Sequence, residues 1–147
     1  MNFLGSMATS SSGMSAQRFR MNIISSNIAN AQTTRTPEGG PYRRRDVIFG
    51  ALPAPRTFAE ELRSKVTEET PLHAKVLGVS VDERSPILKY DPSHPDANEE
   101  GYVAMPNVNP MEEMVNLMLA SRSYEANVAA FNATKSMALR ALEIGRG

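Results

Sequence analysis

Residues that could hold a metal ion gather in one polar turn of the sequence. Asp91, His94, Asp96, Glu99 and Glu100 fall within a single stretch of ten residues, and carboxylate oxygens are the ligands that hard cations prefer. The stretch lacks the glycine-punctuated spacing of a calcium loop, and the residues between the charges are typical of turns. We therefore interpret these side chains as solvated turn charges and expect no metal site. A small metal-assisted enzyme built on this turn is the weaker alternative.

Other residue types that carry catalysis are scarce. The sequence has no cysteine, which excludes disulfides, thiolate zinc ligands and a thiol nucleophile. The other of its two histidines, His73, stands alone between leucine and alanine. The serines occur without a Gly-x-Ser-x-Gly elbow, and the pair Gly39 and Gly40 lies between prolines rather than at the start of a helix. We expect no enzyme activity, no cofactor and no small-molecule substrate.

One basic cluster could contact a phosphate backbone. Tyr42 is followed by Arg43, Arg44 and Arg45, and arginines beside an aromatic ring are typical of nucleic-acid contacts. The cluster is small, however, and the chain balances 16 basic against 16 acidic residues for zero net charge. Because binding through phosphate charge needs a larger footprint, we expect no nucleic acid and interpret the cluster as a partner-binding or solvated strand.

Proline placement divides the sequence into three segments, residues 1–36, 37–108 and 109–147. All ten prolines lie from Pro37 to Pro110, and proline is excluded from helix interiors. The first segment follows a heptad pattern that predicts a helix. Its serine-, threonine- and glycine-rich start favours helix poorly, so this helix needs a partner surface. The a and d positions are Phe3, Met7, Ser10, Met14, Gln17, Met21, Ile24, Ile28 and Ala31.

The last segment predicts a longer helix. Asn109 is a favourable N-cap, Pro110 suits the first helical position, and Glu112 and Glu113 face the positive end of the helix dipole. Gly145 supplies a stop. We expect the two terminal helices to pair antiparallel like a coiled coil; the alternative is two helices packed on a compact core. The apolar stripe predicted for the last helix comprises Met114, Leu117, Ala120, Tyr124, Val128, Phe131, Ala138, Leu139 and Leu142.

The middle segment predicts a small β-rich domain. Residues 75–82, 87–90 and 101–105 are short runs rich in β-branched, apolar or aromatic residues, as in strands. Prolines and alternating charges indicate a mobile stretch at 50–71, which could include a short helix over 58–66. The expected fold class is α+β, with long N- and C-terminal helices and a small β-rich middle domain.

Several longer motifs resemble a known protein family. Residues 25–31, SSNIANA, closely resemble the N-terminal signature of bacterial flagellar rod and hook proteins, and residues 12–18, SGMSAQR, are similar to the same block. Residues 33–44, TTRTPEGGPYRR, narrow the resemblance to the proximal rod proteins of the flagellar basal body. It continues through GYVAMPNVNP at 101–110, SRSYEANV at 121–128 and KSMALRALEIG at 135–145.

The resemblance implies a structural role. Members of this family form the rod, the drive shaft that crosses the periplasm and is needed for motility, and they polymerise with their terminal helices in the inner core. The implied partners are proximal and distal rod subunits, further copies of the chain, and the adaptor between rod and export apparatus. The implied location is the basal body, reached by flagellar type III export. The expectation of export without a cleaved signal agrees with a start that lacks basic and continuous apolar regions.

The sequence also suits a subunit that assembly buries. A chain exported unfolded should lack disulfides and order its ends when polymer contacts offset the entropy cost. Methionines adapt to unlike neighbours, and Asn27 and Asn30 could bind backbone groups of a neighbouring subunit or simply cap the helix end. A soluble coiled-coil adaptor or chaperone is the remaining alternative. The residues expected at the assembly interface are Met7, Met14, Met21, Ile24, Asn27, Ile28, Asn30, Met114, Leu117, Tyr124, Val128, Phe131, Leu139 and Leu142.

Overall fold

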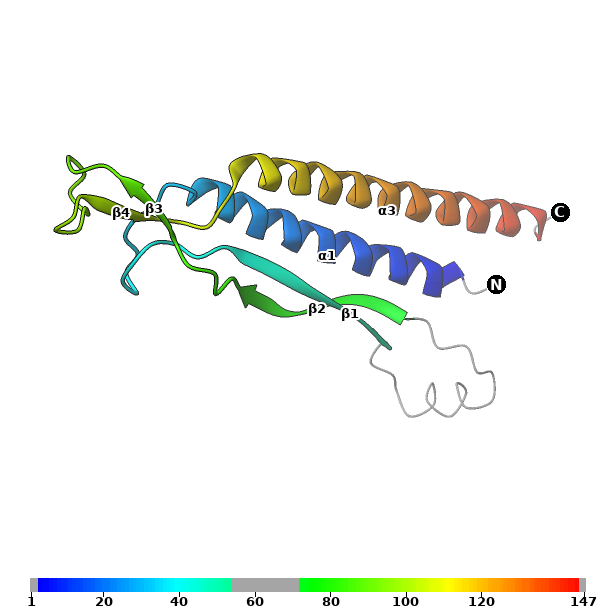
Figure 1. The fold of residues 1–147 in the computed structure, drawn as a ribbon. Helices are drawn as coiled ribbons and strands as arrows, with labels where there is room; N and C mark the ends of the chain where they lie inside the picture. Colours follow the sequence, from blue (N-terminus) through cyan, green and yellow to red (C-terminus); the bar gives the residue numbers. More distant parts are fainter. Residues whose placement is uncertain (1–2, 54–71, 146–147) are drawn as a thin grey trace. The chain divides into compact units, whose positions relative to one another are not determined.

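The structure is a computed structural model that describes residues 3–53 and 72–145 of the chain (Figure 1). The expected α+β class, with two long terminal helices and a small β-rich middle, is confirmed. The short helix expected over 58–66 lies outside the described residues. None of the described helices is long and apolar enough to cross a membrane. The described elements are α1 (Phe3–Ala29), β1 (Arg45–Pro53), β2 (Leu72–Val81), β3 (Ile87–Tyr90), β4 (Tyr102–Met105) and α3 (Pro110–Ile144).

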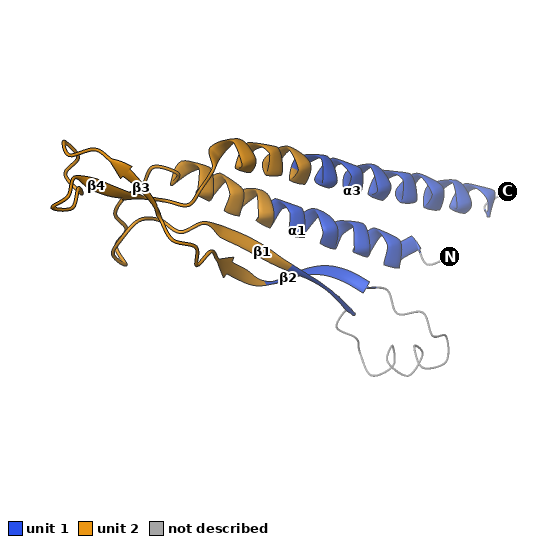
Figure 2. Ribbon diagram, viewed as in Figure 1, with its two compact units in different colours: residues 1–18, 49–77, 121–147 blue, residues 19–48, 78–120 orange. Residues whose placement is uncertain are grey.

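The chain divides into two compact units (Figure 2). Each unit contains a stretch of both helices and a stretch of β1 and β2, while β3 and β4 belong wholly to unit 2. Within unit 1, α1 begins at the end where α3 finishes, so the two helical stretches run antiparallel there. Unit 1 comprises residues 1–18, 49–77 and 121–147, and unit 2 comprises residues 19–48 and 78–120.

The hydroxyl-rich start of α1 is helical because its side chains find partners. Thr9 Oγ1 donates to the carbonyl of Gly5, one turn earlier, at 3.0 Å, and lies 3.3 Å from the carbonyl of Leu72 in β2. The hydroxyl of Ser12 accepts the N–H of Ala74 at 3.1 Å. Residues of low helix propensity thereby tie α1 to the start of β2 within unit 1, and tertiary contacts override that propensity.

Helix α3 starts and stops where its sequence predicts. Asn109 Oδ1 accepts the N–H of Met111 at 3.0 Å, and the Asn109 carbonyl accepts the N–H of Glu113 at 3.0 Å. This side-chain bond is that of an N-cap, which satisfies an otherwise unpaired amide of the first turn. At the other end the N–H of Gly145 donates to the carbonyl of Ala141 at 3.2 Å.

Small residues are buried or closely packed along both helices. In unit 1, a Cβ added to Gly13 would lie 2.7 Å from Asn127 Oδ1, and Ala16 is buried. In unit 2, Ala120 is fully buried. Of the predicted stripe, Leu117, Ala120, Tyr124, Val128, Phe131 and Ala138 are buried or half-buried, whereas Met114, Leu139 and Leu142 are exposed.

Residues 50–53, the start of the stretch expected to be mobile at 50–71, belong to strand β1 instead. The remainder of that stretch lies outside the described residues. Strand β1 pairs with β2 in a two-stranded sheet. Gly50 disfavours a strand by itself, but a Cβ at this position would lie 2.6 Å from Leu77 Cδ1. The glycine therefore leaves the space that the Leu77 side chain fills in unit 1.

Strands β3 and β4 form a second, antiparallel two-stranded sheet in unit 2. Lys89 lies opposite Val103, which is buried, and Tyr90 lies opposite Tyr102. The two tyrosine rings meet edge to face with centroids 5.3 Å apart, a favourable aromatic geometry. These strands coincide closely with the predicted runs at 87–90 and 101–105.

Candidate functional site

Asn27, near the end of α1, is fully buried in unit 2 and uses every hydrogen-bonding position of its amide. Its Nδ2 donates to the carbonyl of Arg45 at 2.7 Å and to Glu113 Oε2 at 2.8 Å. Its Oδ1 accepts the Tyr42 hydroxyl at 2.9 Å and the N–H of Arg45 at 3.0 Å. One side-chain amide therefore satisfies both backbone groups at the start of β1, as a neighbouring strand would.

Glu113, in the first turn of α3, is a buried carboxyl with only 1% of its surface exposed. Oε1 accepts from Arg44 Nε and lies 2.9 Å from Arg44 Nη2, while Oε2 accepts from Asn27. A buried carboxylate is tolerated only when it is paired and hydrogen-bonded, and both conditions are met here. Asn27, Tyr42, Arg44 and Glu113 are called the Asn27 cluster below.

Arg44 is held by its backbone as well as by its side chain. Its N–H donates to Asn107 Oδ1 at 3.1 Å, its carbonyl accepts the N–H of Asp82 at 2.8 Å, and Nη1 reaches Asp46 Oδ2 at 3.1 Å. Partial burial acts to lower the pKa of Arg44, but hydrogen bonds to Asp46 and Glu113 outweigh it and raise that pKa above its ordinary value. Arg44 therefore stays charged and serves as a structural cation.

The segment from Tyr42 to Asp46 alternates between inward and outward side chains. Tyr42 is buried, Arg44 and Asp46 are half-buried, and Arg43 and Arg45 are exposed. This period of two is that of an extended chain. The basic cluster of the sequence therefore divides into one structural arginine and two arginines that face outwards.

Sequence reasoning singled out Asn27 but missed its partners. In the sequence, Glu113 stands at the positive end of a helix dipole and Arg44 in a basic cluster, and neither position by itself predicts a buried ion pair. The alternation after Tyr42 is the signal that could have separated the inward arginine from its neighbours. The side chain of Asn27 bonds to Tyr42, Arg45 and Glu113 of its own chain, and its role at an interface with a neighbouring subunit stays a prediction.

The residues expected at the assembly interface differ in how accessible they are. Asn30 makes local bonds at the helix end: its Nδ2 donates to the Ser26 carbonyl at 2.9 Å, and its Oδ1 accepts the Thr33 hydroxyl at 3.2 Å. Ile24 and Asn27 are buried; Met7, Met14, Met21, Ile28, Asn30, Leu117, Tyr124, Val128 and Phe131 are half-buried; and Met114, Leu139 and Leu142 are exposed.

Three residues of the acidic turn, Asp91, His94 and Asp96, make hydrogen bonds within the chain. Asp91 accepts the Ser93 hydroxyl at 2.7 Å, and this hydrogen bond lowers the pKa of Asp91. Asp96 accepts the Thr34 hydroxyl at 2.7 Å, and His94 Nδ1 accepts the N–H of Asp96 at 3.1 Å. Nowhere in residues 3–53 and 72–145 do three or more histidine, cysteine or acidic side chains gather in a way that could hold a metal.

Large apolar side chains are exposed along α3 in both units. In unit 2 the exposed residues include three methionines near the start of the helix, and in unit 1 they lie near its end. Monomeric proteins rarely leave such contiguous apolar surface in water, so these faces are candidate contact surfaces. They comprise Met111, Met114, Val115, Met118 and Leu119 in unit 2, and Met137, Leu139, Leu142 and Ile144 in unit 1.

Comparison with known proteins places this arrangement in a family. The family model for flagella basal body rod proteins matches residues 7–35, and the model for the C-terminal region of flagellar basal body rod FlgEFG proteins matches residues 99–144. The first range contains Asn27 and the second contains Glu113, so the hydrogen bond between these side chains joins the two matched regions.

Similar full-length relatives are named flagellar basal-body rod protein FlgC. The one from Borreliella burgdorferi is 44% identical over 100% of both chains, and the one from Bacillus subtilis is 45% identical over 96% of this chain and 97% of its own. The one from Escherichia coli O157:H7 is 40% identical over 92% of both. With identity at this level along nearly the whole sequence, the chain belongs to the FlgC family of flagellar basal-body rod proteins.

Proposed function

We propose that this chain is a structural subunit of the flagellar basal-body rod and not an enzyme. Membership of the FlgC family supports the proposal, as does the name that its relatives share. The polar groups of the Asn27 cluster support it too, because they bond to one another and hold the chain together rather than facing a substrate.

The observation that carries the proposal is the balance of buried and exposed apolar residues. Among the described residues, six hydrophobic side chains are buried and twenty-two large ones are exposed. The single chain therefore leaves much of its apolar surface in water. Exposed side chains such as Met118 (60%) and Leu142 (66%) gain stabilisation when neighbouring subunits cover them. The chain therefore suits an assembly whose contacts complete its packing.

Assembly would use the terminal helices. The exposed residues Met114, Leu139 and Leu142 are accessible without any change of fold, whereas Ile24 and Asn27 support the surface from within. Contacts between unlike surfaces, repeated with a screw rotation, give an open helical tube rather than a closed ring. The partners proposed are further copies of the chain, the other proximal and distal rod subunits, and the adaptor between rod and export apparatus. The proposed setting is the basal body in the periplasm, reached by flagellar type III export without a cleaved signal.

An in-frame deletion of the gene in its source bacterium tests the function. The proposal expects cells that do not swim and basal bodies without a complete rod in electron micrographs, both restored by the intact gene. Normal swimming with complete rods would contradict it. A discrete soluble oligomer that never enters basal bodies would favour the adaptor alternative.

A further inference from the structure

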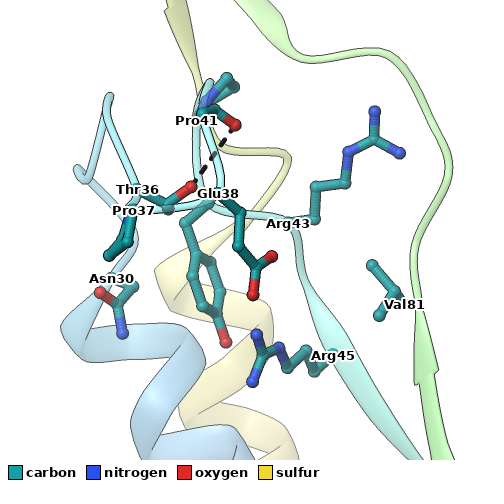
Figure 3. A pocket seen from close by; sticks show the side chains of 10 residues that line it. Asn30, Thr36, Pro37, Glu38, Pro41, Arg43, Arg45 and Val81 are labelled. Atoms are coloured by element: carbon teal, nitrogen blue, oxygen red, sulfur yellow. Dashed lines mark hydrogen bonds between the residues drawn. The ribbon is translucent and has the colours of Figure 1, made fainter.

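The two outward arginines of the basic cluster line a pocket in unit 2 (Figure 3). The cavity has a volume of about 430 Å³. The side chains of Arg43 and Arg45 leave the same stretch of chain, and Val81 supplies an exposed apolar wall. The remaining lining residues are Asn30, Thr36, Pro37, Glu38, Gly39, Pro41 and Tyr42.

The wall opposite the arginines is a fixed turn. The N–H of Thr36 donates to the carbonyl of Gly40 at 2.9 Å, and the N–H of Gly39 donates to the carbonyl of Thr36 at 3.0 Å. Gly39 and Gly40 have φ values of 89° and 75°, a conformation that side chains other than glycine rarely adopt. The pocket is thus formed within the chain itself, and a ligand need not order this turn on binding.

The cations of the pocket keep donors free for a ligand. No ion pair among the described residues involves Arg43 or Arg45. The Arg45 guanidinium lies 5.7 Å from the centre of the Tyr42 ring, and the Asn27 cluster fixes that ring through its hydroxyl. Glu38 contributes one negative charge, so the three charged side chains of the lining leave a net charge of +1. Guanidinium groups with free donors favour a carboxylate, which they can bind in a fork geometry.

A matching pair of carboxylates occurs in the same unit. Glu99 and Glu100 are consecutive and exposed in the turn between β3 and β4, and no described ion pair involves them. Asn98 Oδ1 accepts the N–H groups of Glu100 and Tyr102 at 3.1 and 2.8 Å, which holds the turn. Both carboxylates are therefore presented on a fixed backbone.

We propose that the Glu99–Glu100 turn of one copy of the chain docks into the Arg43 and Arg45 pocket of a second copy. The inference rests on the proposed rod function and names one contact within that assembly. The charges are complementary, and both surfaces belong to unit 2, at the end where α1 finishes (Figure 2). In the proposed contact, two copies stand side by side in the same orientation, and the turn of one enters the pocket of the other. The two surfaces are unlike, so the contact repeats from copy to copy without closing.

Charge reversal tests the proposal in cells that carry the gene deletion. The variant Arg43→Glu with Arg45→Glu, or Glu99→Arg with Glu100→Arg, should reduce the number of complete basal bodies roughly tenfold, because like charges then face each other. Combining all four substitutions should recover most of that loss. Equal yields for all variants, or a fourfold variant no better than either double variant, would overturn the proposal. Circular dichroism of the purified variants should match wild type, since all four side chains are exposed.

Chemical crosslinking identifies the occupant of the pocket. The chain has no cysteine, so Arg43→Cys and Glu100→Cys introduce unique thiols. A short bismaleimide is the right reagent, because an arginine–glutamate pair spans more than a disulfide allows. Co-expression of the two single variants should give a product of twice the subunit mass in isolated basal bodies. The matched control replaces Arg43→Cys by Arg35→Cys, an exposed arginine of the same unit outside the pocket.

The outcomes of these tests separate this inference from the rod function. If the deletion strain swims normally, the rod function itself fails. If the deletion abolishes swimming but all charge variants assemble like wild type, the pocket contact alone is wrong. A crosslink from Arg43→Cys only to a different protein, or a dimer of equal yield with Arg35→Cys, would likewise contradict docking between copies.

Discussion

Replacing Asn27 by alanine removes four hydrogen bonds in one step. The substitution leaves the Tyr42 hydroxyl, both backbone groups of Arg45 and one oxygen of Glu113 without their partner. Glu113 keeps its bonds to Arg44 through the other oxygen. The variant therefore does not release a wholly unpaired buried charge, and the loss is that of several orphaned polar groups.

The magnitude follows from the kind of bond that is lost. A neutral hydrogen bond contributes about 1 kcal/mol net, and a bond to a charged group about 1.5–3 kcal/mol. Such losses within one network are not additive, and water can reach the partly exposed start of β1. We therefore expect the free energy of unfolding to fall by about 3–5 kcal/mol, which is large for a single substitution.

Urea denaturation followed by circular dichroism measures this effect. With a dependence of about 2 kcal/mol per molar urea, the midpoint should fall by about 2 M. The matched control is Asn30→Ala, three residues later, because among the described residues the Asn30 side chain bonds to Ser26 and Thr33 of its own segment. We expect the control to lose no more than about 1 kcal/mol. Equal urea midpoints for the two variants would contradict this prediction, since the Asn27 cluster would then contribute no more stability than a local cap.

Three further measurements probe other parts of the fold. A hydrogen bond from Arg84 lowers the pKa of Asp82 from 3.8 to about 2. Because the pKa is lower in the folded state, this pair stabilises the fold at pH values above 3.8, and the stabilisation is lost as the pH falls towards 2. Asp82→Asn should therefore reduce the fall of the urea midpoint between pH 3.8 and about 2. The same fall as in the wild-type chain would show that the Asp82–Arg84 pair does not cause it. Gly101→Ala should lower the free energy of unfolding by about 1–3 kcal/mol, because Gly101 has a φ of 82° and an added Cβ would lie 3.0 Å from the Tyr90 ring. The matched control is Gly78→Ala, because a Cβ at Gly78 meets nothing within 4 Å. Equal urea midpoints for the two variants would contradict this prediction. In hydrogen exchange of the free chain, the amides of Asn27 and Ile28 should be protected longer than those of residues 139–144, whose side chains are exposed; the reverse order would contradict the placement of the core.

The sequence predicts those elements that depend on local signals. The start of α3 follows from Asn109 and Pro110, because capping needs only neighbouring residues. Strands β3 and β4 follow from short apolar runs on either side of a turn. Local signals do not predict strand β1 to its end, because Gly50 disfavours a strand. The glycine leaves space for the Leu77 side chain, and this contact between residues distant in the sequence cannot be read from a local pattern.

Sequence patterns predict neither the buried face at the start of α3 nor the Asn27 cluster. The helical period of 100° per residue places Met114 on the predicted apolar face, yet Glu113 beside it is the residue that turns inwards. That choice depends on Arg44 and Asn27, which neutralise and bond the carboxylate from two other segments. Periodicity ranks residues by hydrophobicity and therefore cannot recognise a buried charge whose partners come from elsewhere.

Assembly into the rod is expected to cover apolar faces that the single chain leaves in water. Met118→Cys tests it directly, because Met118 is 60% exposed and the chain has no other thiol. The purified chain should react quickly with a maleimide, whereas the same thiol in intact basal bodies should react only after the basal bodies are denatured. Equally fast labelling in intact basal bodies would show that assembly leaves this face of α3 in water. Absence of the chain from basal bodies would show that it is not a rod subunit.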